Sequence, residues 1–120
     1  MHKSLLILIL VATSFAVSGQ NDISGLWNTG KQNTKVQIVE EEGIYSGVIY
    51  SSDNENAKIG RQLLKNVKSE DGKLKGKLYS IKKDKWVNVV VSENEDVLTL
   101  KVKAGMIKRT IEWDRATEDN

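Results

Sequence analysis

The side chains able to carry chemistry in this 120-residue chain are carboxylates, lysines, tyrosines and hydroxyls, because it has one histidine and no cysteine. The histidine, His2, lies in an N-terminal segment that we expect to be removed. A Ser-His-Asp triad and a cysteine nucleophile paired with histidine are then excluded. The usual zinc and copper sites also need imidazole or thiolate ligands, so we expect no metal site and no cofactor.

Carboxylates and lysines remain as candidates for catalysis, and a pair of carboxylates could hydrolyse a glycosidic bond. The acids here, however, lie in turns or alternate with lysines, which is typical of a solvated surface. We therefore predict that the protein is not an enzyme.

The last apolar stretch contains the best candidate for a ligand contact. Arg109 alternates with Ile111 and Trp113, so an extended strand places all three on one face. A guanidinium buried without a partner is too costly to persist. Arg109 is expected either to turn to solvent at a rim or bulge, or to anchor the carboxylate of a ligand. Together with Leu100 and Val89, these residues form the predicted ligand-binding set.

Apolar residues at period two predict short strands through most of residues 23–115, separated by polar turns. The segment 59–68 is ambiguous, because Leu63, Leu64 and Val67 fit either a helical turn or a strand with a bulge. The other expected strands are residues 23–29, 34–41, 44–51, 73–81, 85–92, 97–103 and 106–115.

Seven or eight consecutive short strands without a long helix predict an all-β fold. Such a meander hides its two edges by closing, so we expect a small antiparallel up-and-down β-barrel of about eight strands. A sandwich is the alternative, but no connection is long enough for a Greek-key crossover. The alternating lysines at 73, 75, 77, 101 and 103 are expected to protect edges and keep the surface soluble.

The two ends of the chain are expected to meet where the barrel closes. In a closed meander the first and last strands are neighbours, so Trp27 can cover the barrel floor with the Arg115 guanidinium against its ring. Such a cation–π contact contributes about 0.5–2 kcal/mol. Gly25 would let the backbone approach closely. Gly25, Trp27 and Arg115 are therefore the predicted barrel-closing residues.

The Gly25-Leu26-Trp27 triplet with a late arginine resembles the signature of the lipocalin (calycin) superfamily, whose barrels hold small apolar ligands. From residue 23 to residue 115 the chain resembles a family of uncharacterised secreted bacterial proteins, the domain of unknown function 2147. The stretches that carry this resemblance are Gly25-Leu26-Trp27-Asn28-Thr29-Gly30, Val36-Gln37-Ile38, Tyr45-Ser46-Gly47-Val48-Ile49, Ile59-Gly60-Arg61-Gln62-Leu63-Leu64, Gly76-Lys77-Leu78-Tyr79, Leu98-Thr99-Leu100 and Trp113-Asp114-Arg115. The resemblance implies a lipocalin-like barrel and an exported location, and it brings no established activity or catalytic residue.

Residues 1–19 have the order of a secretory signal peptide: a basic start at His2-Lys3, an apolar run, and the small residues Ser18-Gly19 before Gln20. The apolar run is shorter than the roughly 20 residues needed to span a bilayer, and there is no cysteine to carry a lipid anchor. We predict cleavage near Gly19-Gln20 and one barrel domain over residues 20–120. The expected location is periplasmic or secreted, without stable membrane insertion.

Two functions stay open. The net charge of +2 is too small to indicate a nucleic acid or an anionic lipid as partner. A barrel of about eight strands is either filled by its own side chains or holds one small ligand. The first prediction is a module that binds a small apolar or amphiphilic ligand inside the barrel. The alternative is a structural or interaction protein of the cell envelope with a filled core, whose partner is another envelope protein.

Overall fold

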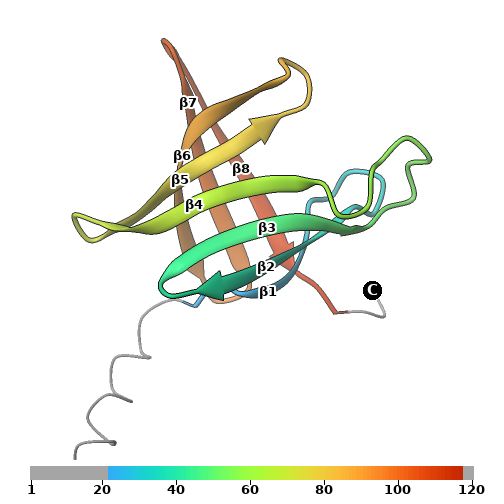
Figure 1. The fold of residues 1–120 in the computed structure, drawn as a ribbon, viewed down its shortest axis with the longest axis horizontal. Coiled ribbons are helices and arrows are strands. Elements are labelled where there is room, and N and C mark those ends of the chain that lie inside the picture. Colours follow the sequence, from blue (N-terminus) through green and yellow to red (C-terminus); the bar gives the residue numbers. More distant parts are fainter. Residues whose placement is uncertain (1–21, 118–120) are drawn as a thin grey trace, which may run out of the picture.

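The computed structural model describes residues 22–117, which form eight antiparallel strands closed into one barrel (Figure 1). Each strand pairs with the next along the chain, and β1 also pairs with β8. The strands are β1 (Gly25–Asn28), β2 (Lys35–Glu41), β3 (Ile44–Ser51), β4 (Gln62–Glu70), β5 (Lys73–Ser80), β6 (Lys85–Asn94), β7 (Val97–Ala104) and β8 (Ile107–Arg115). The predicted all-β up-and-down barrel is confirmed. The predicted signal peptide, residues 1–19, lies outside the described residues.

The ambiguous segment 59–68 contains the first part of β4, and the spacing of its apolar residues has a local cause. Leu64 and Val67 are both 0% exposed although they lie three positions apart. Between Lys65 and Lys68 the register with β5 shifts, and Asn66 adopts a left-handed conformation with a φ of 54°. A bulge that inserts one residue returns Val67 to the buried face. Of the two predicted alternatives, the bulged strand is therefore confirmed.

Gly76 on β5 provides the space for this bulge. A Cβ atom at Gly76 would lie 2.5 Å from Val67 Cγ2 and 2.7 Å from Val67 Cα. Distances this short do not occur between real Cβ atoms and their neighbours. The bulge can therefore pack against β5 only because residue 76 has no side chain.

Two tight turns fix the register of neighbouring hairpins. Both central residues have positive φ in the β2–β3 turn (Glu42 54°, Gly43 83°) and in the β4–β5 turn (Asp71 56°, Gly72 80°). This conformation is that of a type I′ turn, whose twist matches the twist of the flanking strands. Both turns carry a carboxylate as the residue before the glycine, which places negative charge at the tips of these hairpins.

The barrel interior is packed with the protein's own side chains. Inward-facing residues from all eight strands and the preceding Ile23 form one core cluster. Six inward-facing side chains from six strands are at most 8% exposed: Ile38, Ile49, Leu78, Val89, Leu100 and Trp113. Side chains this buried contact other protein atoms rather than a cavity large enough for water. The interior of this small eight-stranded barrel is therefore filled by side chains rather than hollow.

The two ends of the barrel differ in their connections. The turns β2–β3, β4–β5 and β6–β7 lie at one end, which we call the floor end, together with the start of β1 and the end of β8. The turns β1–β2, β3–β4, β5–β6 and β7–β8 lie at the opposite end, which we call the loop end. In Figure 1 the floor-end turns lie along the left and lower sides and the loop-end turns along the upper and right sides. Within residues 22–117, no helix is long and apolar enough to cross a bilayer.

Candidate functional site: a latch at the floor end and a cationic groove

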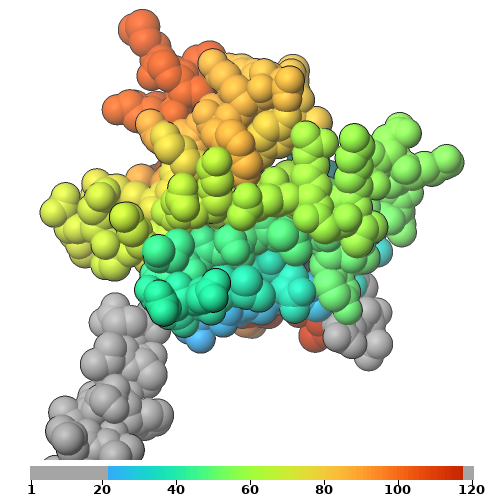
Figure 2. Space-filling view, in the orientation of Figure 1, coloured from blue at the N-terminus to red at the C-terminus, as the bar shows by residue number. Residues whose placement is uncertain are grey.

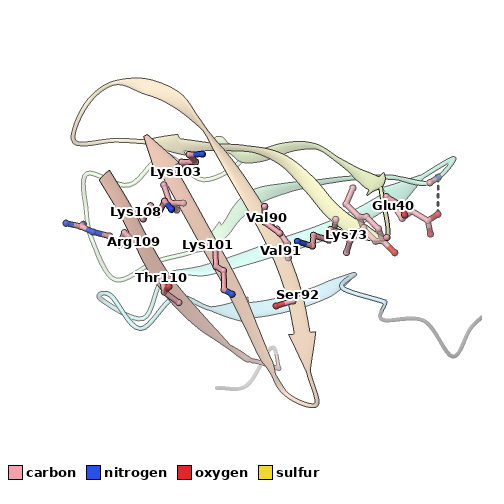
Figure 3. A pocket seen from close by; sticks show the side chains of 16 residues that line it. Glu40, Lys73, Val90, Val91, Ser92, Lys101, Lys103, Lys108, Arg109 and Thr110 are labelled. Carbon is pink, nitrogen blue, oxygen red and sulfur yellow. Dashed lines mark hydrogen bonds between the residues drawn. The ribbon is translucent and has the colours of Figure 1, made fainter. Parts of the chain in front are cut away.

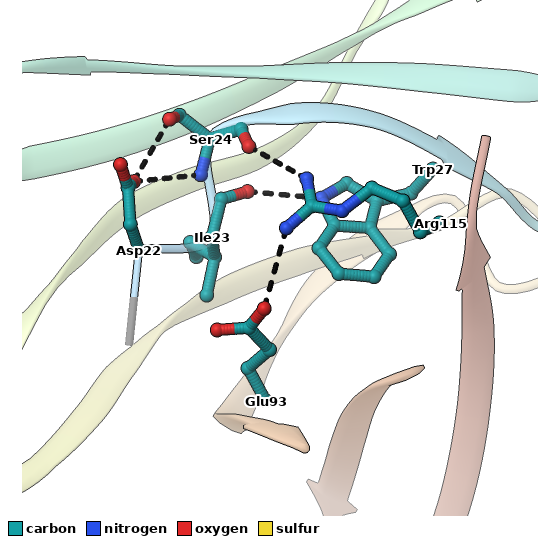
Figure 4. Close-up of polar contacts among 6 residues, drawn as sticks. All are labelled: Asp22, Ile23, Ser24, Trp27, Glu93 and Arg115. Atoms are coloured by element: carbon teal, nitrogen blue, oxygen red, sulfur yellow. Dashed lines mark hydrogen bonds and ion pairs between the residues drawn. The ribbon is translucent and has the colours of Figure 1, made fainter. Parts of the chain in front are cut away.

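The barrel closes at the floor end through a short contact between its first and last strands. Strand β1 pairs with β8 at two positions, Trp27 with Arg115 and Asn28 with Asp114. The Arg115 guanidinium carbon lies 4.0 Å from the centroid of the Trp27 ring, and Trp27 is 0% exposed (Figure 4). We call this contact the latch. Since few backbone hydrogen bonds join these strands, side-chain contacts must supply much of the closure.

Each polar group of the latch has a partner. Arg115 Nη1 donates to the Ser24 carbonyl at 2.8 Å, and Arg115 Nη2 donates to Glu93 Oε2 at 3.2 Å. The Trp27 indole Nε1 donates to the Ile23 carbonyl at 2.9 Å. Figure 4 shows that the guanidinium joins three segments: the chain before β1, β1 itself and the end of β6. These contacts give the latch a structural role.

Gly25 is required beside the latch for two reasons. Its φ of +121° is a conformation that residues with side chains rarely adopt. A Cβ atom at this position would also lie 2.6 Å from Arg115 Nη1. The close approach expected at Gly25 is therefore present, and it is an approach to the arginine.

Asp22 stabilises the chain segment that enters β1. Its Oδ1 accepts hydrogen bonds from the Ser24 backbone N–H at 3.0 Å and from the Ser24 hydroxyl at 2.8 Å. These bonds favour the ionised carboxylate, the backbone bond most strongly, and they hold the pKa of Asp22 below its usual value of 3.8. The carboxylate thereby fixes the carbonyl of Ser24, which Arg115 uses as an acceptor.

A groove with a volume of about 840 Å³ lies against β6, β7 and β8 and reaches the β2–β3 and β4–β5 hairpins (Figure 3). Its charged lining is unequal, with five cations and the single carboxylate of Glu40. The cations are Lys73, Lys101, Lys103, Lys108 and Arg109. Apolar contact surface comes from Tyr45, Leu74, Val90, Val91 and Val102. The groove therefore combines positive charge with an apolar lining.

The cations of the groove have few internal contacts. Within residues 22–117, no hydrogen bond or ion pair is formed by the side chains of Lys73, Lys101, Lys103, Lys108 and Arg109. In Figure 3 Lys73 extends from β5 toward Val91 on β6, whereas Arg109 points away on the far side of β8. Their charge is thus available to a ligand.

Like charges also lie directly opposite one another in the ladders. Lys103 pairs with Lys108 between β7 and β8, while β4 and β5 place Lys65 opposite Lys77 and Lys68 opposite Lys75. Directly opposed like charges destabilise a sheet. On β5 the strain is relieved, because Lys77 Nζ donates to Asn88 Oδ1 at 2.5 Å and Lys75 lies 4.0 Å from Asp71. The Lys103–Lys108 pair has no such relief among the described residues.

The predicted ligand-binding residues do not gather in one place. Arg109 lines the groove and is exposed. Leu100, Val89 and Trp113 belong to the packed core at 0%, 2% and 5% exposure, and Ile111 is half-buried against it. Within the described chain, the half of β8 that carries Arg109 pairs only with β7, because β1 reaches just Arg115 and Asp114. This short β1 leaves Arg109 solvated although it alternates in phase with buried Trp113.

The sequence interpretation missed the lysines of the groove: it assigned Lys73, Lys101 and Lys103 to edge protection and did not single out Lys108. Lys101, Lys103 and Lys108 come from two strands, and Lys73 comes from a third. The alternation of lysines was visible in the sequence. What brings the rows together is the β7–β8 register, which pairs Lys101 with Thr110 and Lys103 with Lys108.

Two half-buried rings, Tyr79 and Trp86, form a second group, and cations of the protein itself lie against both rings. Tyr79 and Trp86 meet edge to face with centroids 5.3 Å apart. Arg61 lies 4.7 Å from the Tyr79 centroid and Lys65 lies 4.2 Å from the Trp86 centroid. The Tyr79 hydroxyl donates to Asp84, and this bond raises the pKa of the phenol. We interpret this cluster as packing on the barrel surface.

Comparison with known proteins finds no match to this chain. No family model matches the chain, and neither a curated protein nor a solved structure matches it. The fold and the groove define a small closed antiparallel barrel with a cationic groove. Most of the apolar lining of this groove belongs to the core or packs against it, through Tyr45, Leu74, Val91 and Val102. Membership of the lipocalin superfamily or of the family of unknown function stays a prediction.

Proposed function

We propose that this protein is an exported binding module that holds a small amphiphilic anion, such as a long-chain carboxylate, in the groove along β6, β7 and β8. The observation that carries the proposal is the lining of that groove: five cations and one carboxylate beside an apolar surface. An acidic headgroup would lie among the lysines, and an alkyl chain would lie along the valines and leucine.

The groove is a better site than the barrel interior. The interior residues Val89, Leu100 and Trp113 are already in contact with other core side chains, and a ligand there would have to displace them. The groove has a volume of about 840 Å³, within the range of about 300–1,000 Å³ that small-molecule sites occupy. Arg109 also lines the groove, but it points away on the far side of β8, so the headgroup contact falls to the lysines of β7 and β8.

Calorimetric titration of the full chain with dodecanoate tests the proposal. Wild-type protein is expected to bind, and dodecanol, which has the same chain without the charge, is expected to bind at least about tenfold more weakly. The double variant Lys101→Gln/Lys103→Gln, which removes two lysines on one face of β7, should lose at least about tenfold in affinity for dodecanoate. The matched control is Lys68→Gln/Lys75→Gln, two opposed lysines that do not line the groove.

The expected thermal stability separates binding from folding. Lys101 and Lys103 are exposed, so their replacement should leave the melting temperature nearly unchanged. Equal dodecanoate affinity in both double variants would show that the groove cations do not bind the headgroup. Absence of binding by the wild-type protein would overturn the proposal.

A second candidate function is supported by the packed interior. A barrel whose core is filled has no need of a ligand to be stable, and it can serve as a structural or interaction protein of the envelope. Native mass spectrometry of protein recovered from its own envelope distinguishes the two. An added mass of lipid size favours the binding module, whereas an added mass of protein size favours the interaction protein.

A further inference from the structure

Exposed apolar side chains stand at the tips of three separate turns of the loop end. Ile59 in the β3–β4 loop is 62% exposed, Ile81 in the β5–β6 turn is 63% exposed and Met106 in the β7–β8 turn is 98% exposed. Single exposed apolar residues are normal on a protein surface. Three such residues lie at the tips of the same end of the barrel and contribute nothing to the core. Their shared location indicates that this end contacts another surface.

Cations flank each of these apolar tips. Lys58 and Arg61 lie on either side of Ile59, Lys82 and Lys83 follow Ile81, and Lys103 and Lys108 bracket Met106. The carboxylates in these turns are Asp53, Glu55 and Asp84, and Asp84 already accepts the Tyr79 hydroxyl. The loop end therefore carries an excess of positive charge around its apolar tips.

The floor end has the opposite charge. Its three turns or their flanks carry Glu40, Glu41, Glu42, Glu70, Asp71, Glu95 and Asp96. The net charge of +2 averages these two ends and hides their difference. An anionic surface would attract the loop end and repel the floor end, which orients the barrel.

We propose that the loop end docks reversibly on an anionic lipid bilayer, with Ile59, Ile81 and Met106 entering the headgroup region and the flanking cations facing lipid phosphates. A bilayer surface offers both negative charge and an apolar layer beneath it, so it matches both features of this end. Figure 1 shows the three turns along the upper and right sides of the barrel. In Figure 2 the β7–β8 tip and the β3–β4 loop project from the body of the molecule. Lys103 and Lys108 also line the groove, whereas Lys82 and Lys83 do not, so the charge test of this inference uses Lys82 and Lys83.

An environment-sensitive dye at one tip tests this contact locally. Because the chain contains no cysteine, Ile81→Cys in the full chain accepts a single nitrobenzoxadiazole label. The matched control is Ile44→Cys, an exposed isoleucine at the floor end (42% exposed). Vesicles of phosphatidylcholine with phosphatidylglycerol should shift the emission of the Ile81 label to the blue and leave the Ile44 label unchanged. Vesicles of phosphatidylcholine alone should shift neither.

Vesicle sedimentation then separates the apolar and charged contributions. Ile59→Ser/Ile81→Ser/Met106→Ser should reduce binding to the mixed vesicles at least tenfold, and Val39→Ser/Ile44→Ser at the floor end should not. Lys82→Glu/Lys83→Glu should also reduce vesicle binding at least tenfold while leaving dodecanoate affinity unchanged, since neither lysine lines the groove. Every variant carries the same N-terminal segment, so any contribution of that segment is constant.

Three results would overturn the inference. The first is that the Ile44 label shifts to the blue as much as the Ile81 label does, or that neither label shifts. The second is that the triple serine variant binds the mixed vesicles as tightly as wild type does. The contact would then be electrostatic only, as with a soluble polyanion. The third is equal binding to vesicles with and without phosphatidylglycerol.

Discussion

Replacing Arg115 with alanine should open the barrel at its weakest seam. The change removes the cation–π contact with Trp27, at 4.0 Å, and the hydrogen bond to the Ser24 carbonyl, at 2.8 Å. The first contributes up to about 2 kcal/mol at a desolvated site, and a hydrogen bond from a charged group contributes about 1.5–3 kcal/mol. The ion pair with Glu93 adds little because Arg115 is 30% exposed.

The free energy of unfolding should therefore fall by about 3 kcal/mol, since β1 and β8 pair at only two positions and cannot compensate. For a domain of this size that corresponds to a melting temperature lower by roughly 12 °C or more. Urea unfolding followed by circular dichroism measures the change. Arg109→Ala, an exposed arginine on the same strand, is the control and should lie within about 0.5 kcal/mol of wild type.

A double-mutant cycle identifies the partner. Combining Arg115→Ala with Trp27→Leu should cost less than the two single changes added together, because each already removes their shared contact. Additive effects, or an Arg115→Ala variant as stable as Arg109→Ala, would refute the latch as the element that closes the barrel.

Three further predictions concern the rest of the barrel. Gly76→Ala should destabilise the fold by about 1–3 kcal/mol in thermal melts, because its Cβ would lie 2.5 Å from Val67 Cγ2; wild-type stability would mean that the β4 bulge is not packed against Gly76. Leu100→Ala, at a site 0% exposed, should cost about 2–5 kcal/mol in urea, and a smaller loss would indicate a loosely filled interior. Asp22→Asn should be less stable than wild type near neutral pH. Since the folded pKa of Asp22 lies below its usual 3.8, its contribution is complete above that pH and is lost as the pH falls through the folded value, so the two stability curves should converge at low pH. A gap that persists at low pH would assign the loss to something other than the ionised carboxylate.

The fold followed from the sequence because a barrel depends on local features that repeat along the chain. Period-two alternation in residues such as Leu98, Leu100 and Val102 reports which face is inward without reference to other strands. The closing contact of Trp27 with Arg115 was also accessible, since a closed meander makes the first and last strands neighbours. The bulge at Asn66 was harder, because three-residue spacing fits a helical turn equally well.

The groove was out of reach of the same reasoning. The sequence left open whether Arg109 turns to solvent or enters the barrel, and the structure shows it exposed. The choice depends on how far β1 extends along β8, which alternation does not reveal. The charge difference between the two ends was hidden for a related reason. Acidic turns such as Glu42-Gly43 and basic turns such as Lys82-Lys83 follow one another along the chain and cancel in the net charge. Antiparallel connection sorts them into opposite ends of the barrel.

Methyl and backbone NMR of the full chain during titration with dodecanoate tests the central claim most directly, because it locates the bound anion residue by residue. A packed interior with the binding site in the groove predicts shifts at Lys101, Val102 and Arg109, with the methyl signals of Ile38 and Leu100 unchanged. Shifts concentrated at Ile38 and Leu100, with the groove silent, would contradict it by placing the ligand inside the barrel.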